Sequence, residues 1–434
     1  MRTSDSRELP GGTRSRLGGG FLTQLTVAGL VLTGLHAARP MVTYRALDLG
    51  AGPFEIGLVQ SAFSLLPAFT AVALGRWIDR IGEGRFLLTA VSMMGVASFL
   101  LAFAPSLVAI AVAQMIYGLG QVINVIAGQA MIANRTPRDG REGAYSWYST
   151  VVSVAQLAGP AIAAVMVGSA LSATVAGIGP FAGNEEAVVF LFAAGCGGVA
   201  ALLATRLLDR GPRARTADAD VARVNLLSAA WVVLRKPGMA AAMLVSLTVI
   251  SAIDVLVAYL PAYGEANGLP VETVGLLLAV RAGASLTSRL FMPQLIKRLG
   301  RKPLLVLSSA LAGAGIVLLP FVSSVPLLVG LMVVIGLGLG LGQPMTIAWV
   351  ANRASRRERG LALGVRVTGN RAALLTVPAA MGALAGASGI AAIWVALAVF
   401  LGGGALVAMR TSFDDPAREP AAQVVDASEP PGSA

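Results

Sequence analysis

The sequence has little of what disulfides and metal sites are built from. It contains one cysteine, Cys196, and one histidine, His36, which excludes an intramolecular disulfide and a zinc site of histidine and cysteine. The phosphate-binding signature GxxxxGK followed by Ser or Thr is also missing, which argues against a pump driven by ATP. We therefore expect no metal and no cofactor. No nucleophile with a neighbouring base is visible, so we do not expect an enzyme.

Charged residues are scarce as well. They make up 13% of the 434 residues, and hydrophobic residues make up 56%, whereas a soluble domain is about 25% charged. Such an excess of apolar residues cannot be hidden in a water-soluble core. The 51 glycines fit a membrane protein because small residues let membrane helices approach closely. The composition therefore predicts an all-α protein within a lipid bilayer, with room for about twelve spans.

The apolar segments form two groups of six. We predict a cytoplasmic tail at 1–20, a six-helix bundle at 21–205, a cytoplasmic linker at 206–237, a second six-helix bundle at 238–409 and a disordered cytoplasmic tail at 410–434. The predicted spans are 21–47, 54–78, 86–103, 107–133, 143–168, 187–205, 238–263, 272–296, 303–321, 325–350, 360–384 and 389–409.

Positive charge lies on one side of these spans. The 33 Lys and Arg residues concentrate in the two tails and in the loops after even-numbered spans, and the other loops contain none. The positive-inside rule then makes both termini cytoplasmic. We read the net charge of +11 as topology rather than nucleic-acid binding, because the charges sit in short clusters between apolar segments. A cleaved signal peptide is the alternative for the basic start, although its removal would break the alternation of charge.

The second half of the chain repeats the first at an offset of 218 residues. Glycine, proline and polar positions coincide without a gap over the first five spans of each half. An even number of spans in each repeat makes the repeats parallel, with the substrate site near the middle of the bilayer between them. The matched residues are Gly50 with Gly268, Gly57 with Gly275, Gly82 with Gly300, Gly118 and Gly120 with Gly336 and Gly338, Asn134 and Arg135 with Asn352 and Arg353, and Pro160 with Pro378.

The loop between the second and third spans carries a motif. The motif residues are Gly75, Asp79, Arg80, Gly82 and Arg85. They resemble the signature loop of the major facilitator superfamily, and the counterpart at 295–302 is degenerate, with Lys297 in place of the aspartate. The resemblance implies a transporter of two parallel six-helix repeats in which this loop controls gating. The alternative is that these charges only set the topology.

Two further positions bear on the type of transporter. Gly159-Pro160 in the fifth span is similar to the Gly-Pro motif of exporters in the drug and proton antiporter families, although it could be only a packing kink. Gln114 in the fourth span stands where those antiporters carry an arginine that the family ties to proton coupling. The resemblance therefore favours export and leaves the usual coupling route in doubt.

Ionisable residues inside the spans are the main candidates for the site, because each costs about 2.5–3.5 kcal/mol to insert. They are His36 and Arg39 in the first span, Asp254 in the seventh, Arg281 and Arg289 in the eighth, and Arg366 and Arg371 in the eleventh. His36 and Asp254 are equivalent in the repeat, so we predict that they face each other and carry the coupling proton. The arginine forks suit carboxylate or phosphate oxygens of a solute. The alternative is that some of the arginines pair with helix C-termini or with Asp254.

Uncharged polar residues add to this set. Gln114, Gln121 and Asn124 share one face of the fourth span with Tyr117, and Gln343 with Thr346 in the tenth span lies opposite in the repeat. We expect both groups to line the substrate pathway, although such residues also form ordinary hydrogen bonds between helices.

These observations predict a gradient-driven secondary transporter of the cell (inner) membrane. We expect a monomer that exports a small organic or amphipathic molecule, possibly an anion, with protons as the coupling ion and without nucleic acid as a partner. An importer of organic anions and a non-transporting receptor of the same fold are the alternatives.

The charge distribution yields a first prediction, on topology. A periplasm-dependent reporter such as alkaline phosphatase fused near Glu185 should be active, because that loop follows an odd-numbered span. The same reporter fused in the 206–237 linker should be inactive, and it serves as the control. An inactive phosphatase at Glu185, or activity there of a reporter that works only in the cytoplasm, would overturn the twelve-span arrangement.

Overall fold

The chain folds into long helices. The computed structural model describes residues 19–137, 140–181, 183–208, 231–354 and 359–411, and within these ranges there are helices and no strand. Most of the predicted linker and of both predicted tails lie outside the described residues. The long helices of the first half are α1 Gly19–Asp48, α2 Pro53–Ile81, α3 Glu83–Ala102, α4 Leu107–Arg135, α5 Arg141–Val167 and α7 Ala187–Ala204. Those of the second half are α9 Met239–Ala266, α10 Val271–Leu299, α11 Arg301–Leu318, α12 Val325–Arg353, α13 Arg359–Ser388 and α14 Ala391–Arg410.

The helices have the length and composition that a membrane requires. Eleven of those in the described part of the chain are long and apolar enough to cross a bilayer, and α2 is a further helix of 29 residues. Helices suit this setting because they satisfy their own backbone hydrogen bonds without water. The predicted all-α membrane fold is therefore confirmed.

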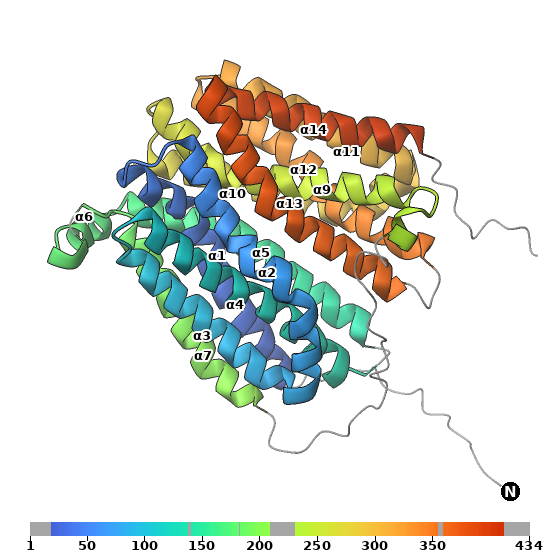
Figure 1. Ribbon diagram of the computed structural model, residues 1–434, viewed down its shortest axis with the longest axis horizontal. Coiled ribbons are helices and arrows are strands. Elements are labelled where there is room, and N and C mark those ends of the chain that lie inside the picture. Colours follow the sequence, from blue (N-terminus) through green and yellow to red (C-terminus); the bar gives the residue numbers. More distant parts are fainter. Residues whose placement is uncertain (1–18, 138–139, 182, 209–230, 355–358, 412–434) are drawn as a thin grey trace, which may run out of the picture.

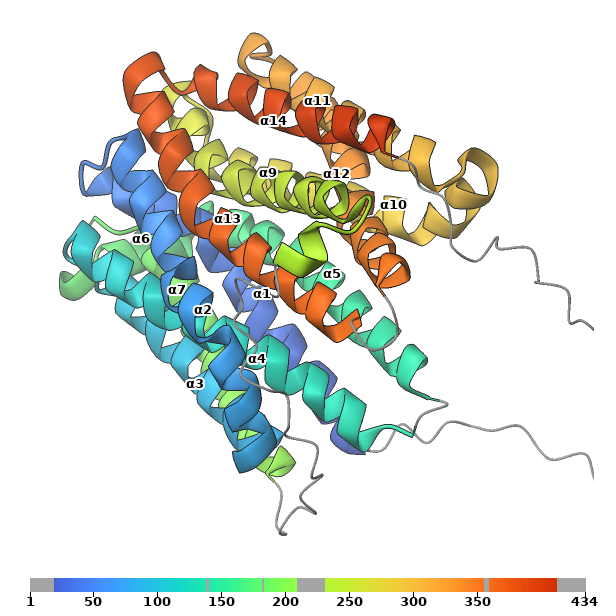
Figure 2. The ribbon, with the colours of Figure 1, turned by 45° about the vertical axis from the view of Figure 1, so that its right-hand side comes forward.

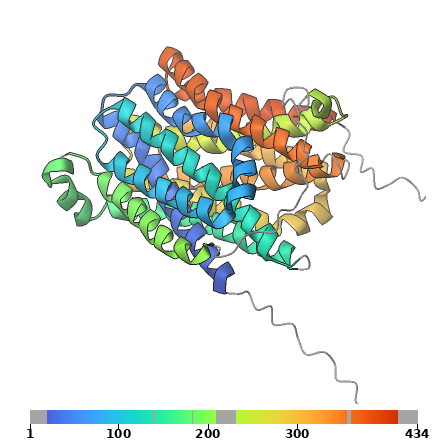
Figure 3. The same cartoon turned by 60° about the horizontal axis from the view of Figure 1, so that its bottom comes forward.

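One short helix was not predicted. Between α5 and α7 the chain forms α6 (Ala170–Ala176) and a 3-10 turn at Gly179–Phe181; two further 3-10 turns occupy Thr205–Leu207 (η2) and Leu319–Phe321 (η3). Helix α6 projects from one end of the bundle (Figure 1 and Figure 3). Its seven residues are too few to cross a bilayer, which is why hydrophobicity over a long window did not reveal it.

The two halves form two bundles that face each other (Figure 1). Across the interface α2 lies against α13, and α10 lies against α5. These two contacts are equivalent in the repeat, because α2 and α10 are the second long helices of their halves and α5 and α13 the fifth. The structure thus has the approximate two-fold arrangement that parallel repeats produce.

Matched glycines show that the repeat is also one of packing. A Cβ atom on Gly118 would collide with the carbonyl oxygen of Phe63, and a Cβ atom on Gly336 would collide with that of Arg281. Phe63 and Arg281 are themselves 218 residues apart. In both halves, therefore, the fourth helix touches the backbone of the second helix at the same point, which only glycine allows.

The halves are joined at the end where α1 ends and α2 begins. We call this the outer end, and the opposite one the inner end, after the orientation that the charges predict. Tyr259 Oη of α9 lies 3.1 Å from the carbonyl oxygen of Pro53 in α2 and 2.8 Å from that of Pro378 in α13. Gly57 and Gly382 leave room for it, since a Cβ atom on either would lie within about 2.6 Å of the hydroxyl. Toward the inner end, α2 and α13 diverge (Figure 1 and Figure 2).

The outer contact provides a second prediction. A Cβ atom on Gly275 of α10 would lie 2.8 Å from the Cβ atom of Ala164 in α5, and a disulfide needs about 3.5–4.5 Å. If α5 and α10 moved apart by roughly 1 Å, Ala164→Cys and Gly275→Cys could therefore form a disulfide between the halves. We expect oxidation to stop transport and reduction to restore it, because the outer end must open once in each cycle.

The experiment uses a Cys196→Ser background, which removes the native thiol, and each single cysteine variant serves as the control. Cross-linking is followed by mobility after proteolysis in the 209–230 segment. A cross-linked protein that transports at the uncross-linked rate would show that this contact does not open.

Candidate functional site

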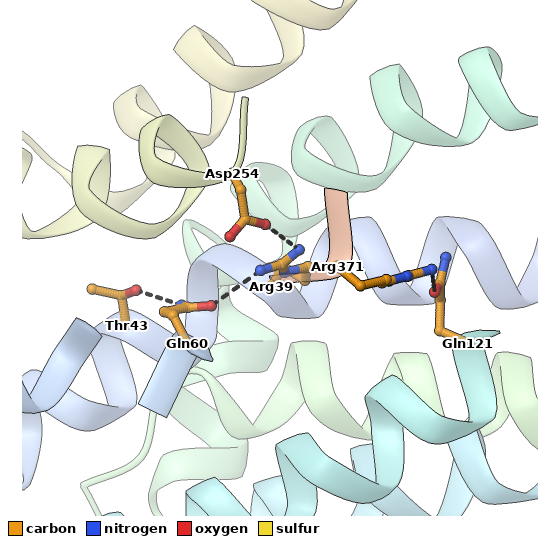
Figure 4. A network of polar contacts seen from close by, with 6 residues as sticks. All are labelled: Arg39, Thr43, Gln60, Gln121, Asp254 and Arg371. Atoms are coloured by element: carbon orange, nitrogen blue, oxygen red, sulfur yellow. Dashed lines mark hydrogen bonds and ion pairs between the residues drawn. The ribbon is translucent and has the colours of Figure 1, made fainter. Parts of the chain in front are cut away.

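Helices α1 and α9, from opposite halves, are joined by an ion pair. Arg39 Nη1 lies 2.7 Å from Asp254 Oδ1 (Figure 4). Asp254 is 6% exposed, and a buried carboxylate is costly unless it is paired. The pair therefore compensates two charges and connects the halves at one point.

The pair continues into a row of hydrogen bonds. Arg39 Nη2 donates to Gln60 Oε1 of α2 at 3.3 Å, and Gln60 Nε2 donates to Thr43 Oγ1 of α1 at 2.9 Å (Figure 4). The Thr43 hydroxyl in turn donates to the carbonyl oxygen of Ala258 in α9 at 2.7 Å. The row starts and ends on α9, so a relative movement of the halves must break it at two places.

An aromatic ring supports the guanidinium group of Arg39. Arg39 Cζ lies 4.6 Å from the centre of the Phe63 ring, and this ring contacts Tyr117 of α4 at a centroid distance of 6.3 Å. A cation over a ring face is stabilised by about 0.5–2 kcal/mol. The ring thereby fixes Arg39 in the orientation that meets Asp254.

A second arginine crosses the interface beside this pair. Arg371 Nη2 of α13 donates to Gln121 Oε1 of α4 at 3.1 Å (Figure 4). The charges that act on Arg371 include those of Asp254 and Arg39. The carboxylate of Asp254 thus acts on guanidinium groups from both halves.

Two further arginines are bonded to neutral groups. Arg289 Nε donates to the carbonyl oxygen of Gly340 at 3.0 Å, and its Nη1 donates to Ser153 Oγ of α5 at 3.1 Å. Arg366 Nη2 donates to Gln343 Oε1 and, at 3.2 Å, to Thr346 Oγ1, both on α12.

The predicted proton pair is arranged differently. The repeat led us to predict that Asp254 faces His36, but the carboxylate of Asp254 is bound by Arg39, one turn further along α1. The repeat places His36 and Asp254 at equivalent depth, whereas the longer side chain of Arg39 reaches across the interface. His36 instead packs under Gly159 of α5, where a Cβ atom would lie 2.7 Å from His36 Cβ. A role for His36 in coupling stays a prediction.

Five of the predicted site residues have a buried polar atom that forms no hydrogen bond with the described residues, and among them are Nε of Arg39 and Nε of Arg366. Gln114 is 0% exposed and neither atom of its amide has a partner among the described residues. The same holds for Asn124 Nδ2 and Arg281 Nε. Such groups are costly in a dry interior, and a role of these residues in the substrate pathway stays a prediction.

The signature-like loop turns at Gly82, where φ is +113° and α3 begins one residue later. The side chains of Asp79 and Arg80, and the surroundings of Gly75, lie outside what the structure describes, and Arg85 is exposed. The carboxylate seen in the first turn of α3 is that of Glu83, which accepts a hydrogen bond from Asn134 of α4. A carboxylate at a helix N-terminus is the interaction that the sequence proposed for Asp79.

The Gly159-Pro160 motif lies between helices of both halves. Gly159 allows α5 to approach α1 at His36 and Ala37, and the carbonyl oxygen of Pro160 lies 3.0 Å from where a Cβ atom on Gly275 of α10 would be. The motif thus occupies a close contact between three helices.

Sequence analysis missed several members of these networks. Gln60 in α2 and Thr43 in α1 connect the halves, and Ser246 in α9 donates to Asn370 Oδ1 of α13 at 3.0 Å. Gln60 and Asn370 could have been found, because each is an amide side chain within an apolar span. Thr43 and Ser246 carry no comparable signal, since hydroxyl groups are ordinary in membrane helices.

Comparison with known proteins identifies one family over most of the chain. The profile described as Major Facilitator Superfamily matches residues 25–280 and 263–430. MdtD of Citrobacter koseri, a multidrug resistance protein by name, is 27% identical over 163 residues, 37% of this chain and 33% of the relative. The MFS-type transporter YhjO of Bacillus subtilis is 28% identical over 131 residues, 30% of this chain and 33% of the relative. The chain spans about a third of the length of these curated relatives.

Solved structures show the same fold at low identity. A bacterial homologue of the human lysosomal transporter Spinster aligns with a TM-score of 0.72 at 16% identity, covering 91% of this chain and 97% of the other. The nucleoside transporter NupG aligns with a TM-score of 0.68 at 15% identity, covering 90% of this chain and 98% of the other.

The ion pair provides a third prediction, on stability. Removing one partner of a buried pair costs about 3–5 kcal/mol because a charge is left uncompensated. Asp254→Asn and Arg39→Gln should each lower stability strongly, and the double variant should be destabilised by much less than the sum. Unfolding is measured in mixed micelles titrated with dodecyl sulfate.

The control for this cycle combines Asp254→Asn with Arg353→Gln at the inner end of α12. Arg353 donates to the carbonyl oxygen of Pro237 at the inner end, whereas Asp254 binds Arg39, so the effects of the two substitutions should add. Additive effects in the Arg39 and Asp254 cycle would show that the two charges do not interact.

Proposed function

The chain belongs to the Major Facilitator Superfamily, and on this premise we propose that it exports a small organic solute that carries an anionic group. It is a multi-pass membrane transporter and not an enzyme. Transport proceeds by alternating access, in which the two halves rock around a site near the middle of the membrane. Protons are the proposed coupling ion, and a monomer is the proposed functional unit.

The observation that carries the proposal is an excess of positive charge between the halves. Five arginines lie in the spans away from the span ends, namely Arg39, Arg281, Arg289, Arg366 and Arg371, and Asp254 is the carboxylate that the described helices place among them. Charged groups in a membrane interior are costly and mark substrate or ion pathways. An anionic solute would supply the charge that the protein itself does not.

Export is supported by two independent features. The matched relatives include a protein named for multidrug resistance, and the Gly159-Pro160 motif resembles that of exporters. The membrane potential adds a physical argument, because a cell interior that is negative drives anions outward by about 2.3 kcal/mol per charge for each 100 mV.

One observation favours import of organic anions as the second candidate. A solute anion that bound Arg39 would displace the carboxylate of Asp254, and the freed carboxylate would then take up a proton more readily. Proton and anion would in this case move together, and an acidic exterior would drive both inward. Export by exchange requires the anion to bind somewhere other than Arg39.

The two candidates are separated by the direction of transport. Everted vesicles containing the protein are given an acidic interior, and uptake of a panel of labelled aromatic carboxylates is compared with that of the matching amides. Exchange predicts accumulation of carboxylates that is lost when the pH gradient is collapsed. Accumulation only in right-side-out vesicles with an acidic exterior would favour import, and no flux for any solute in either orientation would favour a receptor.

The fourth prediction concerns the proton. Asp254→Asn should abolish accumulation against a gradient and keep downhill exchange of the solute, because exchange needs no net movement of protons. Asp254→Glu serves as the control, since it preserves the titratable group. Normal proton-driven accumulation in Asp254→Asn would remove Asp254 from the coupling mechanism.

A further inference from the structure

The five arginines in the spans differ in one respect, which is whether the protein binds their guanidinium groups. Arg39 is bound by Asp254 and Gln60, and Arg371 by Gln121. Arg289 is bound by Gly340 and Ser153, and Arg366 by Gln343 and Thr346. Arg281 has neither a hydrogen bond nor an ion pair to any of the described residues, and its Nε atom is buried.

The position of Arg281 makes this unusual. It lies on α10, is 6% exposed, and has its backbone held against Gly336 of α12. An arginine remains charged at neutral pH and offers five N–H donors. A buried charge without partners costs several kcal/mol, so the fold tolerates a group that opposes its own stability.

The surroundings of Arg281 favour an anion. The charged residue that acts on Arg281 is Arg289, and Arg281 in turn acts on His36 together with Arg39. The carboxylate of Asp254 is bound by Arg39. The described residues therefore provide no hydrogen-bonded or ion-paired counter-charge to Arg281.

We propose that Arg281 is the residue that binds the anionic group of the transported solute, as a fork facing a carboxylate or phosphate. The other arginines hold the structure together or, like Arg39, engage Asp254. This inference rests on the proposed function and assigns separate sites to the two transported species. The solute anion binds Arg281 on α10, and the proton binds Asp254 on α9. Binding at Arg281 leaves the Arg39–Asp254 pair intact, which is the condition that export by exchange requires.

The first test needs no ligand. Arg281→Met removes an uncompensated buried charge, so the purified protein without solute should melt at the same temperature as the wild type or higher, by about 2–4 °C. Arg366→Met is the matched control, and its melting temperature should fall because Gln343 and Thr346 lose their partner. A fall in Arg281→Met as large as in Arg366→Met would show that Arg281 is structural and overturn the proposal.

The second test measures whether anions stabilise the protein through Arg281. Benzoate and phenyl phosphate, compared with neutral benzamide and benzyl alcohol, should raise the melting temperature of the wild type. The shift should disappear in Arg281→Met and persist, weakened, in Arg281→Lys, which keeps the charge and loses the fork. The proposal is overturned if no anion stabilises the wild type more than its neutral analogue, or if the shift survives in Arg281→Met.

Two further measurements, with chloride and with phosphatidylglycerol, distinguish a solute from other anions. If chloride or phosphatidylglycerol stabilises the protein through Arg281 as well as the organic anions do, the site holds an inorganic ion or a lipid headgroup, and the assignment to a solute fails. These binding measurements use no proton gradient, so their outcome does not depend on whether the protein exports the solute. Anion binding at Arg281 without flux in vesicles would refute the transport proposal alone.

Discussion

The structure depends on one constraint, which is that a charge within the membrane must find an opposite charge or a set of hydrogen bonds. Asp254 meets this constraint by reaching Arg39 in the other half, and Gln60 and Thr43 extend the contact back to α9. The pair is costly to form and costly to break. That balance suits a transporter, because two arrangements of nearly equal free energy are needed for the halves to alternate.

Glycine positions determine where the halves and helices can move. Gly57 and Gly382 admit the hydroxyl of Tyr259 at the outer end, and Gly159 brings α5 onto α1 beside His36. These contacts bring backbone atoms of neighbouring helices close together, and the contact at the outer end also includes the buried side chain of Tyr259. The equivalent contacts of Gly118 and Gly336 lie inside each half and keep each bundle rigid.

Much of the fold could be predicted from the sequence because a bilayer leaves few alternatives. Apolar length predicted the long helices, and the 218-residue offset predicted parallel repeats, which the equivalent contacts of Phe63 and Arg281 now explain. The arginines were recognised because charge within a span is rare. That an arginine could pair with Asp254 was one of the alternatives, but the sequence could not show that this arginine is Arg39, since a repeat equates depth and not side-chain reach. The bonds of Thr43 and Ser246 also depend on packing that no spacing encodes.

The division among the arginines links these points. A guanidinium group to which the protein itself provides acceptors, such as that of Arg366 with Gln343 and Thr346, contributes to structure whether or not a solute is present. A guanidinium group left unsaturated at 6% exposure, as in Arg281, contributes most when a ligand arrives, because the ligand offsets the cost of burial. Selectivity for an anion would then come from the cost of the unpaired buried charge, which a bound anion offsets. The same site would reject neutral analogues, which leave the buried charge without a partner.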